Sequence, residues 1–104
     1  MKPQKSLRAR AMDILSRQEI SRVGLKRKLA PYAESEEELA NVLNEFAERN
    51  WQSDQRYAEA YIHSKSRQHG SLRLKQALAQ QGIDETVSRE FMPDKARELQ
   101  TAVA

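Results

Sequence analysis

Residues 21–31 read SRVGLKRKLAP and carry the signals of one short helix with a defined beginning and end. Ser21 is a good N-cap, because its side-chain oxygen can accept a hydrogen bond from a free backbone N–H of the first turn. Leu25 and Leu29 are four residues apart and therefore share one face of the helix. Pro31 disfavours helical backbone in the residue before it, so the helix should stop near residue 30.

The same pattern returns 49 positions later, in residues 70–79, which read GSLRLKQALA. The residues expected to cap and to end the helices recur together with the apolar positions. The pairs of identical residues are Ala9 and Ala58, Ala11 and Ala60, Leu25 and Leu74, Lys26 and Lys75, Leu29 and Leu78, and Ala30 and Ala79. We interpret this as two tandem repeats, with a period in the range of helical repeat proteins.

Further helical patterns flank both segments. Apolar residues at helical spacing predict a helix over residues 6–18, and a capping box that begins at Ser35 predicts one over residues 35–50. Similar patterns predict helices over residues 53–69 and 84–91. The predicted fold is therefore all-α, with tandem three-helix repeats of helix-turn-helix-like units in an elongated and modular arrangement.

This pattern also predicts the domain boundaries. Residues 1–52 should form the first three-helix repeat and residues 53–92 the second. Residues 93–104 should form a short helix, or the remnant of a further repeat. Trp51 is expected to act as a core residue that fills the joint between the two repeats, in preference to the alternative of stacking on nucleic acid.

Composition excludes several classes of protein. No run of 18 apolar residues exists, so we expect no membrane-spanning helix. The absence of cysteine excludes disulfides, thiolate zinc sites and cysteine nucleophiles. No apolar segment follows the basic N-terminus as it would in a secretory signal, so we expect a cytoplasmic protein.

The sequence contains no group of residues with the spacing of a catalytic or metal site. His63 and His69 are six residues apart, which does not place two metal ligands on adjacent helical turns, and we expect both at the surface. The acidic residues in the range 34–38 are explained by their favourable position at the start of a helix. We therefore expect no enzyme activity, no catalytic residue, no metal and no cofactor.

Charge is arranged in blocks although the net charge is only +3. Residues 1–30 carry nine basic and two acidic residues, residues 31–60 carry two and eight, and residues 61–83 carry four and none. The second helices of the two repeats lie in the basic blocks and would present positive charge in register, which suits a polyanion or an acidic groove of another protein. The candidate contact residues are Arg22, Lys26, Arg27, Arg67, Arg73 and Lys75. Few residues that read base edges gather at a helix start, which disfavours sequence-specific DNA recognition.

Two stretches of the chain resemble the RecX family of recombination regulators. One is residues 11–29, AMDILSRQEISRVGLKRKL. The other runs from Asp54-x-x-Tyr-Ala-x-x-Tyr61 to residues 70–83, GSLRLKQALAQQGI, and the similarity covers residues 7–91. The resemblance implies a modular protein that lies along the groove of the filament formed by RecA on single-stranded DNA. It also implies inhibition of the recombinase, ATPase and coprotease activities of RecA, in DNA repair, DNA recombination and the SOS response, by a protein that is not itself an enzyme.

The resemblance implies two partners, the RecA nucleoprotein filament and single-stranded DNA, the latter contacted directly or through RecA. The six basic residues become candidate contacts to the filament or its DNA. For the oligomeric state, we favour a monomer. The residues alone leave an alternative open: a general nucleic-acid-binding helical module that does not require RecA.

The chain departs from the family pattern at two points. Gly24 stands where the family usually has an acidic residue, which removes the capping-box partner of Ser21 and costs about 1 kcal/mol relative to a good helix former. Family members usually carry a third repeat, of which this chain is expected to lack most.

Overall fold

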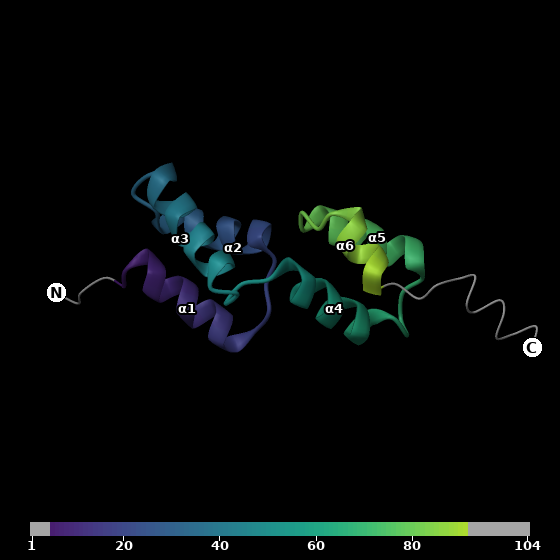
Figure 1. Ribbon diagram of the computed structural model, residues 1–104. Coiled ribbons are helices and arrows are strands. Elements are labelled where there is room, and N and C mark those ends of the chain that lie inside the picture. The colour runs from purple at the N-terminus through teal and green to yellow at the C-terminus, as the bar shows by residue number, and fades with distance from the viewer. Residues whose placement is uncertain (1–4, 92–104) are drawn as a thin grey trace, which may run out of the picture.

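The computed structural model describes residues 5–91, and within this range the chain consists of helices and their connections. The helices form two three-helix units that follow one another along the molecule (Figure 1). In chain order they are α1 (Leu7–Arg17), α2 (Arg22–Leu29), the 3₁₀ helix η1 (Ala30–Tyr32), α3 (Glu36–Glu48), α4 (Asp54–Lys65), α5 (Ser71–Gln80) and α6 (Glu85–Phe91). The predicted all-α fold of tandem three-helix repeats is confirmed. No helix in residues 5–91 is both long and apolar enough to cross a membrane.

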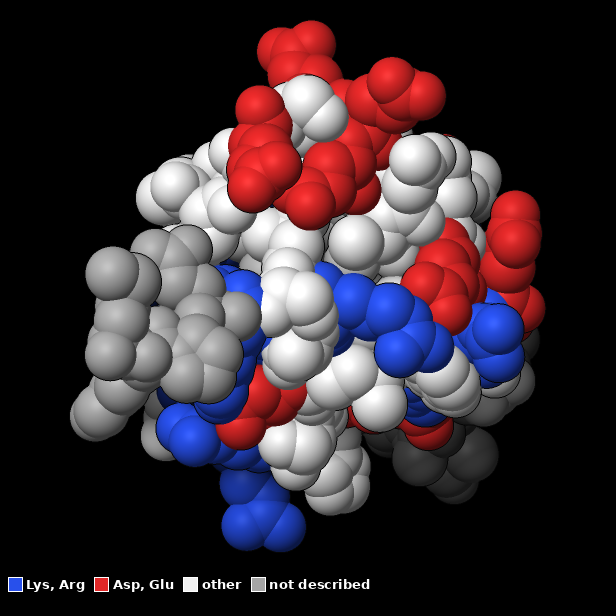
Figure 2. Space-filling view, turned by 90° about the vertical axis from the view of Figure 1, so that its left-hand side faces the viewer, with Lys and Arg blue, Asp and Glu red and all other residues white. Residues whose placement is uncertain are grey.

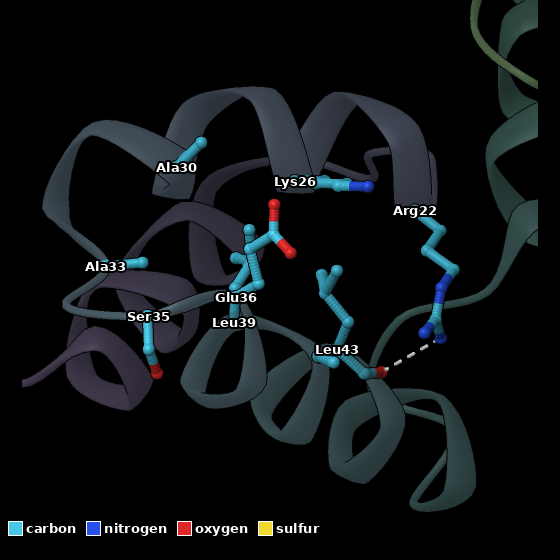
Figure 3. Close-up of a pocket in the computed structure, with 9 residues that line it drawn as sticks. Arg22, Lys26, Ala30, Ala33, Ser35, Glu36, Leu39 and Leu43 are labelled. Atoms are coloured by element: carbon cyan, nitrogen blue, oxygen red, sulfur yellow. Dashed lines mark hydrogen bonds between the residues drawn. The ribbon is translucent and has the colours of Figure 1, made fainter.

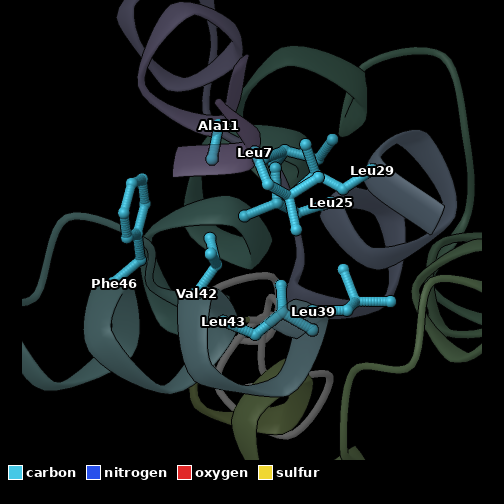
Figure 4. Close-up of a cluster of buried hydrophobic side chains, with 9 residues drawn as sticks. Leu7, Ala11, Leu25, Leu29, Leu39, Val42, Leu43 and Phe46 are labelled. Atoms are coloured by element: carbon cyan, nitrogen blue, oxygen red, sulfur yellow. The ribbon is translucent and has the colours of Figure 1, made fainter. Parts of the chain in front are cut away.

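The first unit comprises α1, α2, η1 and α3, and its three α-helices share one apolar core. Figure 4 shows that side chains from all three helices point toward one another. The buried members of this core are Leu7, Ala11, Ile20, Leu25, Leu29, Leu39, Val42, Leu43 and Phe46. The leucines at four-residue spacing in α2 are both fully buried, as the sequence pattern predicts.

Serine N-caps define where the helices of the first unit begin. The Oγ atoms of Ser6, Ser21 and Ser35 each accept a hydrogen bond, 3.0 Å long in every case, from the backbone N–H three residues later. The cap at Ser21 forms although Gly24 supplies no acidic partner. A Cβ atom at Gly24 would lie only 3.0 Å from Cγ1 of Ile20, so this glycine occupies a crowded position at the start of α2.

The second unit comprises α4, α5 and α6 around a smaller core. Its buried residues are Ala58, Ile62, Leu74, Leu78 and Ile83, with Tyr57, Tyr61, Val87 and Phe91 packed against them. Helix α4 ends at Lys65, which is four residues short of the predicted end, because residues 66–69 form a turn instead of a further helical turn. The predicted helix beyond residue 93 lies outside the described residues.

Polar contacts join the two units where the chain passes from α3 to α4. Oδ1 of Asp54 accepts a hydrogen bond from the backbone N–H of Arg22 at 2.8 Å and another from Nε2 of Gln52 at 2.9 Å. Gln52 is buried and also donates to the backbone carbonyl of Ile20 at 3.2 Å. Since the first N–H groups of a helix lack partners within that helix, Asp54 of the second unit completes the cap of α2 in the first.

Arg56 forms a second link between the units. Its Nε donates to Oε1 of Glu19 at 3.0 Å, and its two terminal nitrogens donate to the backbone carbonyls of Asn50 at 2.7 Å and Trp51 at 2.9 Å. Trp51 itself packs against the core of the first unit, with its ring edge-on to Phe46 and 5.2 Å between centroids. The prediction that Trp51 acts as a core residue is therefore confirmed, but Trp51 belongs to the core of the first unit, and other side chains make the contacts between the units.

An apolar contact completes the joint. Val23 of α2 touches Gly82, which ends the turn after α5 with a φ of 74°. Close by, Arg27 of α2 donates a hydrogen bond to the backbone carbonyl of Gln80 at 3.3 Å. Helix α2 thus contacts both the beginning of α4 and the end of α5, and it fixes the second unit against the first.

Candidate functional site

The six predicted contact residues all lie in the described part of the chain. Arg22, Lys26 and Arg27 belong to α2, Arg73 and Lys75 belong to α5, and Arg67 lies in the turn between α4 and α5. The two helices are the second helices of their units, as the repeat predicts. The structure nevertheless shows a difference among these residues: some of the side chains are held by partners within the protein, and others are exposed. Their spacing in the sequence does not reveal this difference.

Arg22 and Arg27 are held by partners within the protein. The guanidinium group of Arg22 donates to Oδ1 of Asn44 at 2.6 Å and to the backbone carbonyl of Leu43 at 3.3 Å, so it ties α2 to α3 (Figure 3). Arg27 donates to the carbonyl of Gln80 in the joint. Both retain positive charge and further donors, but each has a structural contact that a partner would have to share or displace.

Lys26 lies on the rim of an open groove between α2 and α3. The groove has a volume of about 620 Å³, and Leu39 and Leu43 contribute to its apolar floor. Figure 3 shows the side chain of Glu36 reaching into the space between the two helices, on the side opposite Arg22. In the view of Figure 3, Arg22 lies at one end of the groove, and Lys26 and Glu36 lie closer to its middle, between Arg22 and the end that Ala33 and Ser35 line.

The second unit presents its cations differently. Arg67 and Arg73 are exposed, and the structure shows no ion pair for either within residues 5–91. Lys75 is half-buried on the rim of a smaller groove of about 260 Å³, which Ile83 and Glu85 also line. Lys26, Arg67 and Arg73 are thus the cations of the predicted set that are most available to a polyanion.

Acidic side chains occupy a separate region of the first unit. Figure 2 looks onto the end of the molecule that this unit forms, and acidic residues gather at its upper edge while basic residues lie across the middle and below. The first turn of α3 contributes Glu36, Glu37 and Glu38, whose charge favours the positive end of the helix dipole. A polyanion would therefore meet repulsion at this edge and attraction below it.

The sequence interpretation missed one basic groove. Lys5, Arg10 and Lys28 surround Tyr32 between α1 and η1, in a groove of about 320 Å³. Their positions in the sequence do not reveal this proximity, because the residues come from α1, α2, η1 and the segment before α1 and show no common period. The feature of the sequence that could have indicated this groove is Tyr32, directly after Pro31. The structure shows that the side chain of Tyr32 is exposed.

The histidines differ from each other in their surroundings. His63 is exposed, as predicted, whereas His69 is half-buried, and its buried Nδ1 atom has no hydrogen-bond partner within the described residues. The prediction of a surface position therefore holds for His63 and only in part for His69, which lies in the turn after the early end of α4. Within residues 5–91, no three His, Cys, Asp or Glu residues cluster as metal ligands would.

Comparison with known proteins relates the whole chain to one family. The family model described as "RecX, second three-helix domain" matches residues 53–92. Regulatory protein RecX of Neisseria gonorrhoeae is 83% identical over 104 residues, which cover 100% of this chain and 68% of that protein. Regulatory protein RecX of Chromobacterium violaceum is 50% identical over 88 residues, which cover 85% of this chain and 58% of that protein. The crystal structure of RecX from Lactobacillus salivarius superimposes with a TM-score of 0.74 and 23% identity, over 82% of this chain and 56% of that one, and supports the fold alone.

Proposed function

The chain belongs to the RecX family, and we propose that it is a negative regulator of RecA that binds the filament formed by RecA on single-stranded DNA. The observation that carries this proposal is the 83% identity to a regulatory protein RecX over the full length of the chain. The proposed activity is inhibition of the recombinase, ATPase and coprotease activities of RecA. It requires no catalytic step by this chain, and it places the protein in the cytoplasm with its partner.

The proposed mechanism is steric and electrostatic. Lys26, Arg67 and Arg73 would provide the positive charge that attracts a nucleoprotein filament, because their side chains are exposed. Arg22, Arg27 and Lys75 would contribute to the same field from more fixed positions. Occupation of the filament groove by the two helical units would then compete with contacts that hold RecA subunits, DNA and protein substrates together.

The first experiment is a titration of this protein into the single-strand-DNA-dependent ATPase reaction of RecA. We expect ATP hydrolysis to fall at substoichiometric ratios of the protein to RecA. An unchanged rate, from a protein that shows cooperative thermal unfolding, would contradict the proposal for this chain.

A double charge reversal tests the basic surface itself. Lys26→Glu combined with Arg73→Glu should abolish co-sedimentation with the RecA filament and leave the helical circular dichroism unchanged. The charge-matched control is Arg17→Glu combined with Arg89→Glu, which alters only exposed arginines that form i,i+4 pairs. Equal binding by both double variants would refute the assignment of the surface to Lys26 and Arg73.

The alternative function is that of a general nucleic-acid-binding helical module that does not need RecA. It predicts tight binding to bare DNA, with a steep loss of affinity as the salt concentration rises. The proposed function predicts that tight binding requires the filament.

Sedimentation equilibrium would test the accompanying proposal that the protein is a monomer.

A further inference from the structure

Arg10 and Tyr32 form a stacked pair on the surface of the first unit, away from the groove between α2 and α3. The guanidinium carbon of Arg10 lies 3.9 Å from the centroid of the Tyr32 ring. Tyr32 is 56% exposed, and within residues 5–91 it is the large aromatic residue with an exposed side chain. Trp51, Tyr57 and Tyr61, in contrast, pack against the two cores. The core therefore does not account for the position of Tyr32.

The local backbone holds Tyr32 in place. It ends the 3₁₀ helix η1, in which Pro31 occupies one of the first two positions, and the backbone N–H of Ala33 donates to the carbonyl of Ala30 at 3.2 Å. Proline fixes φ and so limits the freedom of this turn. The ring is thus presented by a rigid turn, and it would lose little conformational entropy when it binds a ligand.

The stacked pair lies in a groove with an excess of positive charge. The groove has a volume of about 320 Å³, and Lys5 and Lys28 line it together with Arg10. Asp13 is its acidic member, and this carboxylate already contacts Lys5 at 3.8 Å and Arg17 at 3.5 Å. Within residues 5–91, neither Arg10 nor Lys28 forms an ion pair. Arg10 and Lys28, which have no ion-pair partner within residues 5–91, therefore lie beside the ring of Tyr32.

We propose that this groove binds single-stranded nucleic acid, with one base stacked on the Arg10–Tyr32 pair and the neighbouring phosphates on Lys28 and Lys5. Aromatic rings and guanidinium planes are the surfaces on which proteins stack unpaired bases, and cations beside them follow the backbone. The groove has the size of a small-ligand site, for which about 300–1,000 Å³ is usual, so it has room for a single base. An acidic peptide would use the cations and would gain nothing from the exposed ring. The proposal assigns a particular groove to direct contact with single-stranded nucleic acid; it shares this ligand class with the alternative function above, and it does not require RecA.

The test is a chemical-shift titration of the ¹⁵N-labelled protein with the oligonucleotide dT4 at low salt. Binding should be weak, on the order of 10⁻⁴ M, since few phosphates are neutralised. The largest shift changes should fall at Arg10, Lys28 and Tyr32, and an abasic tetranucleotide should bind about fivefold more weakly or worse because it cannot stack.

Three variants in the groove and one control outside it make the test specific. Tyr32→Ala should weaken dT4 binding about fivefold or more, whereas Tyr32→Phe should retain it, because stacking needs the ring and not the hydroxyl. Lys28→Gln should weaken binding and reduce its salt dependence. Arg89→Gln is the charge-matched control, and it should bind dT4 like the parent because Arg89 is an exposed arginine outside this groove and outside the predicted contact set.

Several outcomes would overturn the inference. These are shift changes confined to Lys26, Arg67 and Arg73, equal affinity for dT4 and its abasic analogue, equal affinity for a hexaglutamate peptide, or no shift change at all. The RecA ATPase titration is a separate readout, so a failure of the proposed function and a failure of this inference can be distinguished.

Discussion

Val23 and Gly82 are in contact across the boundary between the two units, and the contact leaves no space for a side chain on Gly82. A Cβ atom at Gly82 would lie 2.2 Å from Cγ2 of Val23. The same glycine has a φ of 74°, a conformation that other residues rarely adopt. One position therefore serves both the turn between α5 and α6 and the packing of the second unit on α2.

Replacement of this glycine should weaken the protein severely. We expect Gly82→Ala to lower the free energy of unfolding by about 2 kcal/mol or more, because it combines backbone strain with overpacking against Val23. Gly70→Ala is the control: nothing lies within 4 Å of its Cβ position and its φ is −73°, so only the loss of a favourable N-cap residue of α5, about 0.5–1 kcal/mol, is expected. Urea denaturation measures both, and equal effects would contradict the packing argument.

The repeat relates Val23 to Leu72, but only Val23 has a partner among the described residues. A shift of 49 positions places Leu72 where Val23 stands in the first unit, and Leu72 is 70% exposed. Val23→Ala should cost about 1 kcal/mol because it removes methyl groups from the joint. Leu72→Ala should change the free energy of unfolding by less than about 0.5 kcal/mol. Comparable losses in thermal or urea unfolding would show that Leu72 is not a free surface residue.

The carboxylate of Asp54 should be worth more than an ordinary surface charge. Asp54→Ala removes two hydrogen bonds and leaves the backbone N–H of Arg22 and the amide of Gln52 without this acceptor, so we expect a loss of about 2 kcal/mol. Asp54→Asn keeps an oxygen and should lose less. Glu59→Ala, at an exposed position of the same helix, should be nearly neutral. Chemical denaturation ranks the three variants, and an Asp54→Ala protein as stable as Glu59→Ala would refute this role.

Stability should depend on pH through Glu45. The hydrogen bond from Arg8 lowers the pKa of the Glu45 carboxyl below its ordinary value, and the same contact raises the pKa of Arg8. Because the folded-state pKa of Glu45 is lowered, its contribution is present above pH 4.5 and is lost as the pH falls through the folded-state value. The free energy of unfolding of the parent should therefore fall more steeply in acid than that of Glu45→Gln.

A second glutamate of the same helix provides the control for this pH dependence. Glu48 is exposed and forms no ion pair within residues 5–91. The acid profile of Glu48→Gln should therefore follow that of the parent. Parallel profiles for the parent and Glu45→Gln would show that the contact between Arg8 and Glu45 does not couple folding to protonation.

Local signals in the sequence were sufficient to predict most of the fold. Ser21 and Ser35 cap helices where the sequence indicates, and Asn50, at the predicted end of the helix over residues 35–50, adopts a φ of 60° just after the end of α3. The prediction failed at residues 66–69, where Ser, Arg, Gln and His do not forbid a helix but no apolar residue anchors one. The spacing of apolar residues identifies the buried face of a helix. It gives no information about a segment that has no buried face.

The site was less predictable because partners distant in the sequence decide which cations are available. Arg22 and Lys26 are equivalent in spacing and charge, yet Arg22 is held by Asn44, 22 residues away. Arg27 is held by a carbonyl 53 residues away, across the joint. No local rule relates such positions, so the sequence places these cations on short basic helices but cannot separate those held by partners from those that are exposed.

The role of Asp54 at the start of α2 also has a consequence for the order in which the chain is synthesised. Every buried residue of the first core lies between Leu7 and Phe46, so a nascent chain contains this core before Asp54 has been added. At that stage the backbone N–H of Arg22 still lacks its acceptor. Because domains fold as units with the N-terminal one first, the first unit emerges from the ribosome with one helix end unfinished, and the arrival of the second unit completes it.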